Sequence, residues 1–294
     1  MKTALTIGNF DGIHLGHQAL IEKVVQAAQM RGVASCLVTF RPHPVEFFSG
    51  QKDALTLFDQ ESQFEKLQSL GVQRVHVVPF DKKFSEMTAQ QFFFDFLLPQ
   101  WDPMYIVVGD DFRFGRGREG TLDQLKDWSE AKGIEFQVVP AVTIDHHRIS
   151  TTSIRQALAS KDLNKVHLFL GQDFYLKGPV VHGLQRARTL GIPTANIVPT
   201  VRVFPPQGTY ITSTKVDGII YPSVTNVGVS PTLGEELPVR VETHILDFSR
   251  DIYGQNIQIF FHQFLREERK MSGLQQLKEQ IFLDIQQARS FHGI

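Results

Sequence analysis

Two histidines, His14 and His17, stand three residues apart in the glycine-rich segment GNFDGIHLGH at residues 8–17. A short apolar run precedes this segment and a helical pattern follows it, so backbone N–H groups and the helix N-terminus can together hold an anion. Both imidazoles can face that anion and donate hydrogen bonds where charge builds up at a phosphorus centre. The segment therefore predicts a phosphate site. The alternatives are a two-histidine metal site and ordinary turn histidines.

The loop at residues 109–120 follows another apolar run and mixes aromatic with basic side chains. Phe112 and Phe114 could stack on a ring system, and the three arginines of the loop could hold phosphate. This composition suits a flat anionic ligand at the carboxyl end of a strand. The alternative is a solvated basic loop whose aromatic side chains point inward.

A third polar stretch, at residues 149–155, opens a helical pattern with four hydroxyl groups and Arg155. Hydroxyls at a helix start can bind phosphate, because the helix N-terminus is positive, or they can simply cap the helix. Ser150, Thr151 and Thr152 are the candidates for phosphate binding.

The segment at residues 178–196 combines glycines, cations and oxygen donors. Its candidates for a loop over a polyphosphate are Gly178, Gly183, Arg186 and Arg188. The hydroxyl of Thr194 and the carboxamide of Asn196 are hard oxygen ligands that could hold Mg²⁺ bridging ATP phosphates. Turn chemistry after Pro193 is the alternative for this pair.

Glu242 lies in an alternating stretch, residues 239–248, where residues two apart share one face of a strand. The alternation puts Glu242 and His244 on one face and Val241 and Thr243 on the other. A carboxylate fixed near a nucleotide could accept the proton of an attacking hydroxyl. An ordinary surface carboxylate is the alternative.

Short apolar runs alternate with helical patterns from residue 1 to about 150, which is typical of an α/β layer around a mostly parallel sheet. The predicted strands are rich in β-branched or aromatic residues: 4–7, 33–40, 75–78, 105–108 and 136–139. The predicted helices cover 18–31, 61–70 and 121–132, and residues 151–170 are expected to form one or two helices. These elements place the first three polar segments after a strand or at a helix start.

After Gly171 the pattern changes to short alternating stretches bounded by turn residues, which predicts an all-β domain. The clearest strands, 210–213, 223–227, 239–248 and 257–264, are enough for a small closed barrel. A final helix with one apolar stripe, including Ile285 and Ala288, should pack across the barrel. We therefore expect two domains, residues 1–172 and 173–294.

Lys and Arg total 30 against 31 for Asp and Glu, so no global basic field exists to hold nucleic acid, and small-molecule partners are expected. The single Cys36 cannot form an internal disulfide and stands among apolar residues, which predicts a buried, inert thiol. No window has the length and apolarity to span a bilayer, so we expect no membrane partner and a cytoplasmic location. An oligomer is compatible with the sequence but cannot be derived from it.

The HxGH run at residues 14–17 is similar to the signature of the nucleotidyltransferase superfamily, whose members transfer a nucleoside monophosphate from ATP and release pyrophosphate. Together with TFRPHP at 39–44 and GDDFRFGRGREG at 109–120, it more closely resembles the adenylylating half of bacterial bifunctional riboflavin kinase/FMN adenylyltransferases. The resemblance implies a Rossmann-like α/β nucleotidyltransferase fold, catalysis by His14 and His17, and flavin binding by Asp111, Phe112 and Phe114. The ATP and phosphate contacts that it implies are Gly8, Asn9, Phe10, Asp11, Ser150, Thr151, Thr152 and Arg155.

The second half resembles the flavokinase domain through its GxPTAN segment at 191–196 and the strand VETHILDF at 241–248. This resemblance implies a small closed barrel with a terminal helix, Mg²⁺ at Thr194 and Asn196, and base catalysis by Glu242. It also implies ATP or flavin contacts at the glycines and arginines of residues 178–188. Ala187 departs from the family pattern, which has a glycine before Arg188.

The two resemblances imply two reactions: ATP phosphorylates riboflavin to FMN, and a second ATP adenylates FMN to FAD with release of pyrophosphate. One alternative is a riboflavin kinase with an impaired adenylyltransferase, because Ser153 stands where the family pattern SSTRIR has an arginine. Another is a flavin or nucleotide sensor that binds through Phe112 and Phe114 without turnover.

Overall fold

The computed structural model describes residues 2–50, 56–182, 192–229, 239–269 and 273–294, and the chain divides into two compact units, residues 1–151 and 152–294. The second unit begins at residue 152, earlier in the chain than the domain boundary expected near residue 172. The reason is that α8 (Leu163–Leu170) packs against strands of the second unit. The assignment of functional domains to 1–172 and 173–294 stays a prediction.

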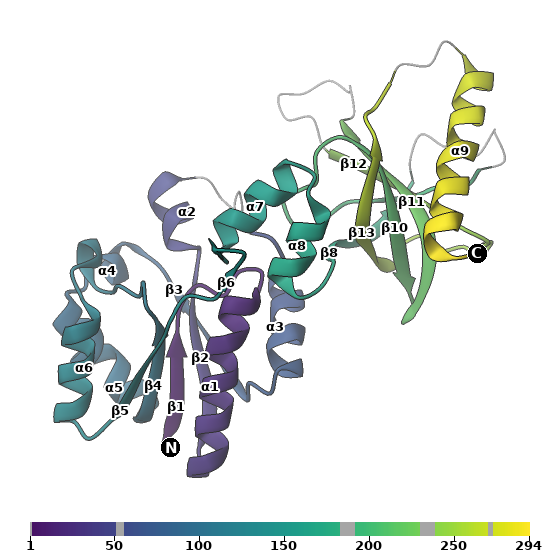
Figure 1. The fold of residues 1–294 in the computed structure, drawn as a ribbon. Helices are drawn as coiled ribbons and strands as arrows, with labels where there is room; N and C mark the ends of the chain where they lie inside the picture. Colours follow the sequence, from purple (N-terminus) through teal and green to yellow (C-terminus); the bar gives the residue numbers. More distant parts are fainter. Residues whose placement is uncertain (1, 51–55, 183–191, 230–238, 270–272) are drawn as a thin grey trace. The chain divides into compact units, whose positions relative to one another are not determined.

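A five-stranded sheet forms the centre of the first unit, with strand order β3-β2-β1-β4-β5 and every neighbouring pair parallel (Figure 1). Its strands are β1 (Thr3–Ile7), β2 (Ala34–Arg41), β3 (Arg74–Pro79), β4 (Pro103–Gly109) and β5 (Glu135–Val139). A two-stranded hairpin follows, made of β6 (Thr143–Ile144) and β7 (His147–Arg148). All five strands predicted for this half are present.

The helices of this unit are α1 (Leu15–Arg31), α2 (Pro44–Ser49), α3 (Gln60–Ser69), α4 (Lys82–Ser85), the π-helix η1 (Gln91–Leu97), α5 (Leu98–Trp101), the 3₁₀-helix η2 (Arg116–Arg118) and α6 (Leu122–Ala131). The predicted helix stops are confirmed at Gly32, Gly71 and Gly133, which adopt φ of 63°, 87° and 68°. A side chain is disfavoured at these left-handed positions, so glycine ends each helix without strain.

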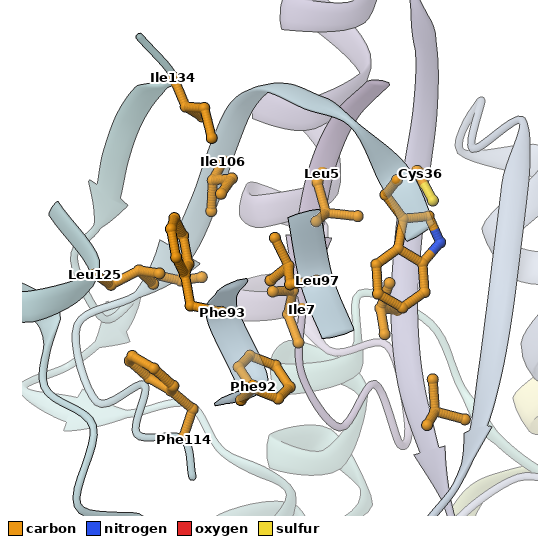
Figure 2. Close-up of a cluster of buried hydrophobic side chains, with 14 of the residues drawn as sticks. Leu5, Ile7, Cys36, Phe92, Phe93, Leu97, Ile106, Phe114, Leu125 and Ile134 are labelled. Atoms are coloured by element: carbon orange, nitrogen blue, oxygen red, sulfur yellow. The ribbon is translucent and has the colours of Figure 1, made fainter. Parts of the chain in front are cut away.

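Both faces of the parallel sheet are covered, as expected for parallel strands. Leu5 and Ile7 of β1 join a cluster with Phe93 and Leu97 of η1, as Figure 2 shows. Ala4 of β1 points the other way and packs with α1. Cys36 is fully buried in the first of these clusters, and burial raises the pKa of its thiol to about 12, so the prediction of an inert thiol is confirmed.

A closed barrel forms the second unit, with strand order β10-β11-β12-β9-β8-β13. Its strands are β8 (Phe174–Val181), β9 (Ala195–Ile197), β10 (Gly208–Val216), β11 (Ile219–Val229), β12 (Val239–Ile245) and β13 (Asn256–Arg266). Its helices are α7 (Thr151–Ala159), which begins at the end of the first unit, α8, and α9 (Leu274–His292). The predicted barrel is confirmed, and β8 and β9 are strands that the sequence patterns did not reveal.

Helix α9 lies along β10 and β11 of the barrel (Figure 1), where Ile285 and Ala288 pack against Ile211 and Val224. The predicted docking of the terminal helix is therefore confirmed. Among the described residues, no helix is both long and apolar enough to cross a bilayer.

Candidate active sites

Strand β1 lies at the centre of the sheet, between β2 and β4, so the chain order reverses beside its carboxyl end. Ligands of open α/β sheets bind at such a switch point. The predicted phosphate segment follows β1, and the aromatic loop at 109–120 follows β4. The fold therefore brings two of the predicted segments to the edge of the sheet where a ligand is expected.

The chain turns sharply after β1 to start α1. Gly12 and Ile13 adopt positive φ of 78° and 43°, and His14 becomes the N-cap of α1. The Nδ1 atom of His14 accepts a hydrogen bond from the backbone N–H of His17 at 3.3 Å. Because this acceptor nitrogen carries no proton, the neutral ring of His14 carries its proton on Nε2.

The imidazoles of His14 and His17 are stacked, with ring centroids 3.7 Å apart and an angle of 17° between the rings. A Cβ at position 16 would lie 3.1 Å from the His14 ring, so a larger residue there would require that ring to shift slightly. Phe10 packs on the other imidazole, with its centroid 5.1 Å from that of His17. The glycine of the HxGH motif therefore lets the His14 ring lie close to the backbone of residue 16.

Burial keeps both imidazoles neutral. It lowers the pKa of His14 from 6.5 to about 4, with a smaller contribution from the charge of Arg148. Burial also lowers the pKa of His17 well below its usual value, and the neighbouring His14 adds to this effect. At pH 7 each ring can therefore donate one N–H and accept at its other nitrogen.

Two buried polar atoms at this site, Nδ1 of His17 and Oδ1 of Asn9, have no hydrogen-bond partner among the described residues. Leaving such groups unpaired costs about 1–3 kcal/mol each. Both atoms belong to the segment in which the sequence predicted a phosphate site, so a polar ligand there would complete their hydrogen bonding.

Phe10 and Asp11, predicted to contact ATP, shape the loop from within. Phe10 is 3% exposed and packs among apolar residues that include Ile21. The Asp11 carboxylate accepts a hydrogen bond from the backbone N–H of Leu57 at 2.9 Å. The backbone carbonyl of Asp11 accepts a hydrogen bond from the hydroxyl of Thr151 at 3.4 Å. The first loop and Thr151, from the hydroxyl-rich stretch, are therefore in contact.

Thr152 and Arg155 belong to the second unit, where Arg155 donates to the hydroxyl of Thr152 at 3.4 Å. Their contact with phosphate stays a prediction from the family resemblance, as does that of Ser150.

The aromatic loop after β4 has one side chain in the core and one above it. Phe114 is 5% exposed and packs against Phe92 and other core residues (Figure 2). Phe112 is partly buried and stacks on Phe114, with centroids 5.7 Å apart. Phe114 thus points into the core, as the alternative interpretation of the loop expected. Phe112 is the better placed of the two to stack on a flat ligand.

Arg148 is a candidate that the sequence reasoning missed. Its guanidinium lies 2.9 Å from a carboxylate oxygen of both Asp110 and Asp111, and its charge reaches His14. Asp111, predicted to bind flavin, therefore forms an ion pair that joins the segment after β4 to β7. The only sequence signal for Arg148 is a cation directly before the hydroxyl-rich stretch.

On the barrel, Glu242 of β12 lies opposite Asn196 of β9 in the strand register. Val241 and Thr243, which flank Glu242, are fully buried, so Glu242 faces outward from the barrel wall and its register partner Asn196 points to the same face. Arg240 holds the carboxylate of Glu242 at 3.4 Å. The structure thus places the predicted base beside one of the two predicted magnesium ligands.

The second predicted magnesium ligand, Thr194, precedes β9 by one residue. The carbonyl of its neighbour Pro193 is hydrogen-bonded to Nδ1 of His244 at 2.7 Å, which anchors this segment to β12.

Gly178 has a packing role that accounts for its lack of a side chain. A Cβ at this position would lie 2.2 Å from the carbonyl oxygen of Val198, so only glycine permits the observed approach of the two backbones. Gly183, Arg186 and Arg188, predicted to cover a polyphosphate, lie outside the described residues, as does Ala187.

Comparison with known proteins assigns a family to each half. The model of the FAD synthetase family matches residues 1–153, and that of the riboflavin kinase family matches residues 170–292. A crystal structure described as a macrolide-efflux protein from Streptococcus pneumoniae has a TM-score of 0.89 at 29% identity, covering 98% of this chain and 94% of its own.

Three relatives carry the name bifunctional riboflavin kinase/FMN adenylyltransferase. The Pseudomonas fluorescens protein is 37% identical over 285 residues, which cover 97% of this chain and 91% of that protein. The Escherichia coli K12 protein is 36% identical over 99% of this chain and 93% of its own, and the Bacillus subtilis protein is 33% identical over 98% and 92%. With both halves matched in this order and relatives aligned over nearly their full length, the chain belongs to the family of bifunctional riboflavin kinase/FMN adenylyltransferases.

Proposed function

We propose that the barrel phosphorylates riboflavin to FMN with ATP and that the α/β unit adenylates FMN to FAD with a second ATP. This proposal rests on one observation: each half that matches a family has its own set of groups suited to phosphorus chemistry. The α/β half has the stacked neutral imidazoles of His14 and His17, and the barrel has the Glu242–Asn196 pair on its wall. Such an enzyme needs ATP and acts in the cytoplasm.

In the kinase reaction, the 5′-hydroxyl of the ribityl chain attacks the γ-phosphorus of ATP. A new oxygen–phosphorus bond forms, the bond to the bridging oxygen breaks, and ADP leaves. Glu242 accepts the hydroxyl proton, the usual role of a carboxylate in phosphoryl transfer. Arg240, 3.4 Å away, holds the carboxylate in place on the strand.

The residues of this site also suit Mg²⁺. Thr194 and Asn196 offer a hydroxyl and a carboxamide oxygen, both hard donors, and Asn196 is 8% exposed beside the carboxylate of Glu242. Bound with ATP, Mg²⁺ would neutralise charge on the phosphates.

In the adenylylation reaction, a phosphate oxygen of FMN attacks the α-phosphorus of ATP and pyrophosphate leaves. His14 and His17 donate N–H groups to the oxygens of this phosphorus as charge builds up on them. Burial keeps the His14 ring neutral near pH 7, so its Nδ1 accepts the backbone N–H of His17 and its proton on Nε2 is directed away from that contact. The hydroxyls of Ser150 and Thr151 hold the pyrophosphate, and Phe112 supports the flavin ring.

One observation favours a second candidate, a kinase whose adenylyltransferase is impaired. Ser153 on α7 offers a single hydroxyl where the family pattern has a guanidinium, which adds a positive charge and can bind phosphate through two parallel N–H groups. The match of both halves to enzyme families weighs against a sensor without turnover.

Two variants assayed from two starting flavins test the assignment. Glu242→Gln should abolish FMN formation from riboflavin while FAD formation from supplied FMN is unchanged. His14→Ala should give the reverse pattern, with FMN accumulating and FAD formation reduced by about a hundredfold or more. Riboflavin consumption by Glu242→Gln at the wild-type rate would show that the base is another residue.

A further inference from the structure

Asn196 and Glu242 are register partners on neighbouring strands, and a third polar residue continues this row onto the next strand. Asn226 of β11 is the register partner of Glu242 on the side away from Asn196. Register partners on antiparallel strands point to the same face, with Cβ atoms about 4.5–5.5 Å apart. Thr225 and Thr243 are fully buried, so Asn196, Glu242 and Asn226 form one row on the outer wall of the barrel.

The carboxamide of Asn226 is held in one orientation. Its Nδ2 donates to Oε1 of Glu268 at 2.8 Å, and its Oδ1 accepts the hydroxyl of Thr209 at 3.5 Å. A primary amide has two N–H groups, and the contact with Glu268 uses one of them. The second N–H of Asn226 is therefore fixed in direction beside the carboxylate that we assign as the base.

Gly228 makes room for this contact. It is the next outward residue on β11, and a Cβ there would lie 2.5 Å from Oε1 of Glu268. A Cβ at this position would require the carboxylate end of the Glu268 side chain to shift, so glycine leaves the observed contact undisturbed.

We propose that Asn226, oriented by Glu268, is a specificity-determining residue of the kinase site that hydrogen-bonds the ribityl hydroxyl next to the one that attacks ATP. The inference rests on the proposed role of Glu242. Two neighbouring hydroxyls of a polyol chain need two neighbouring polar groups, and adjacent register positions on a barrel wall supply them. Glu242 takes the proton of the terminal hydroxyl while Asn226 fixes the one before it.

The surrounding charges explain why an amide suits this position. Arg240 pairs with Glu242 on one side, and the carboxylate of Glu268 lies on the other. His244 is the next outward residue along β12. A carboxylate in place of Asn226 would stand between two others, and like charges that close disfavour ionisation of each.

Substrate and residue changes can be combined to test this contact. Wild-type enzyme should prefer riboflavin over 4′-deoxyriboflavin by about tenfold or more in kcat/KM, because a site built for a hydroxyl rejects an analogue without one. Asn226→Ala should lower kcat/KM for riboflavin by a similar factor, leave that for 4′-deoxyriboflavin nearly unchanged, and leave KM for ATP within about twofold. Equal losses with both flavins would overturn the proposal.

The isosteric variant Asn226→Asp provides an independent readout. It should move the acidic limb of the kinase kcat/KM profile to higher pH by about one unit, since the added charge favours the protonated form of Glu242. Asn164→Asp, the same change at an exposed position of α8, should leave the profile where it is. An unmoved profile in Asn226→Asp would contradict the placement of Asn226 beside the base.

FAD formation from supplied FMN, measured on every variant, reports whether the α/β unit is folded, and the thermal unfolding transition of each variant, compared with wild type, reports whether the barrel is folded. If Glu242→Gln remains an active kinase, the proposed base is wrong. If Glu242→Gln is inactive and both Asn226 variants behave as wild type, only the role of Asn226 is refuted.

Discussion

Burial determines the chemistry of His14 and His17. Stacked at the start of α1, their rings lose water, and the charged form becomes unfavourable. Each ring then serves as a neutral donor and acceptor at a position where the helix N-terminus already favours an anion.

This burial predicts a pH dependence of stability. The pKa of His14 is about 4 when folded and 6.5 when unfolded, so between these values the unfolded chain binds more protons. Stability from this group is complete above pH 6.5 and falls as the pH drops toward 4, by about 3 kcal/mol in all. Titration of the imidazole Hε1 resonance by NMR should give a midpoint near 4 for His14, and a midpoint near 6.5 would contradict its burial.

Spacing along the chain was enough to select His14 and His17, because both belong to one local turn. The same approach missed Arg148, whose contacts with Asp110 and Asp111 exist only once β7 and the end of β4 are brought together. It also could not decide between an inward and a ligand-facing Phe114, since that depends on the apolar cluster around η1.

At the scale of elements, the barrel interior is partly polar. Five serine and threonine side chains from three strands are fully buried and hydrogen-bonded to one another. They are Thr212, Thr214, Ser223, Thr225 and Thr243. A shift of one residue in any of these strands would turn its side chains to the other face. The network therefore favours the register that puts Asn226 and Glu242 on the outer wall.

Removing one member of this network should be costly. Thr243→Val keeps the shape of the side chain but leaves the hydroxyls of Thr214 and Thr225 each without one partner, so we expect a loss of about 1–3 kcal/mol in the free energy of unfolding. Chemical denaturation measures this loss. The same substitution at the exposed Thr143 should cost less than about 0.5 kcal/mol, and equal effects at both positions would show that the network contributes nothing.

The strands with the longest alternation, β10 to β13, were predictable from sequence, and so were the five strands of the parallel sheet. β8 was missed although Phe174, Leu176 and Val180 alternate inward, because Gly178 and Pro179 suggest a turn. β9 has three residues, too few for a periodic signal. Neither omission affected the prediction of a barrel, since the remaining strands still required closure.

At the scale of the whole molecule, the product of one unit is the substrate of the other. The barrel carries Glu242 and Asn196, the α/β unit carries the stacked histidines, and the family matches assign a reaction class to each half. FMN made in the first reaction supplies the phosphate oxygen that attacks ATP in the second. The account therefore requires both activities in one chain.

The flavins formed from riboflavin, ATP and Mg²⁺ test this requirement most directly. Chromatography of the wild-type reaction over time should show FMN rising first and FAD following, with pyrophosphate released in step with FAD. Accumulation of FMN without FAD would contradict the assignment of an active adenylyltransferase to the α/β unit, and riboflavin that stays unchanged would contradict the account of both units.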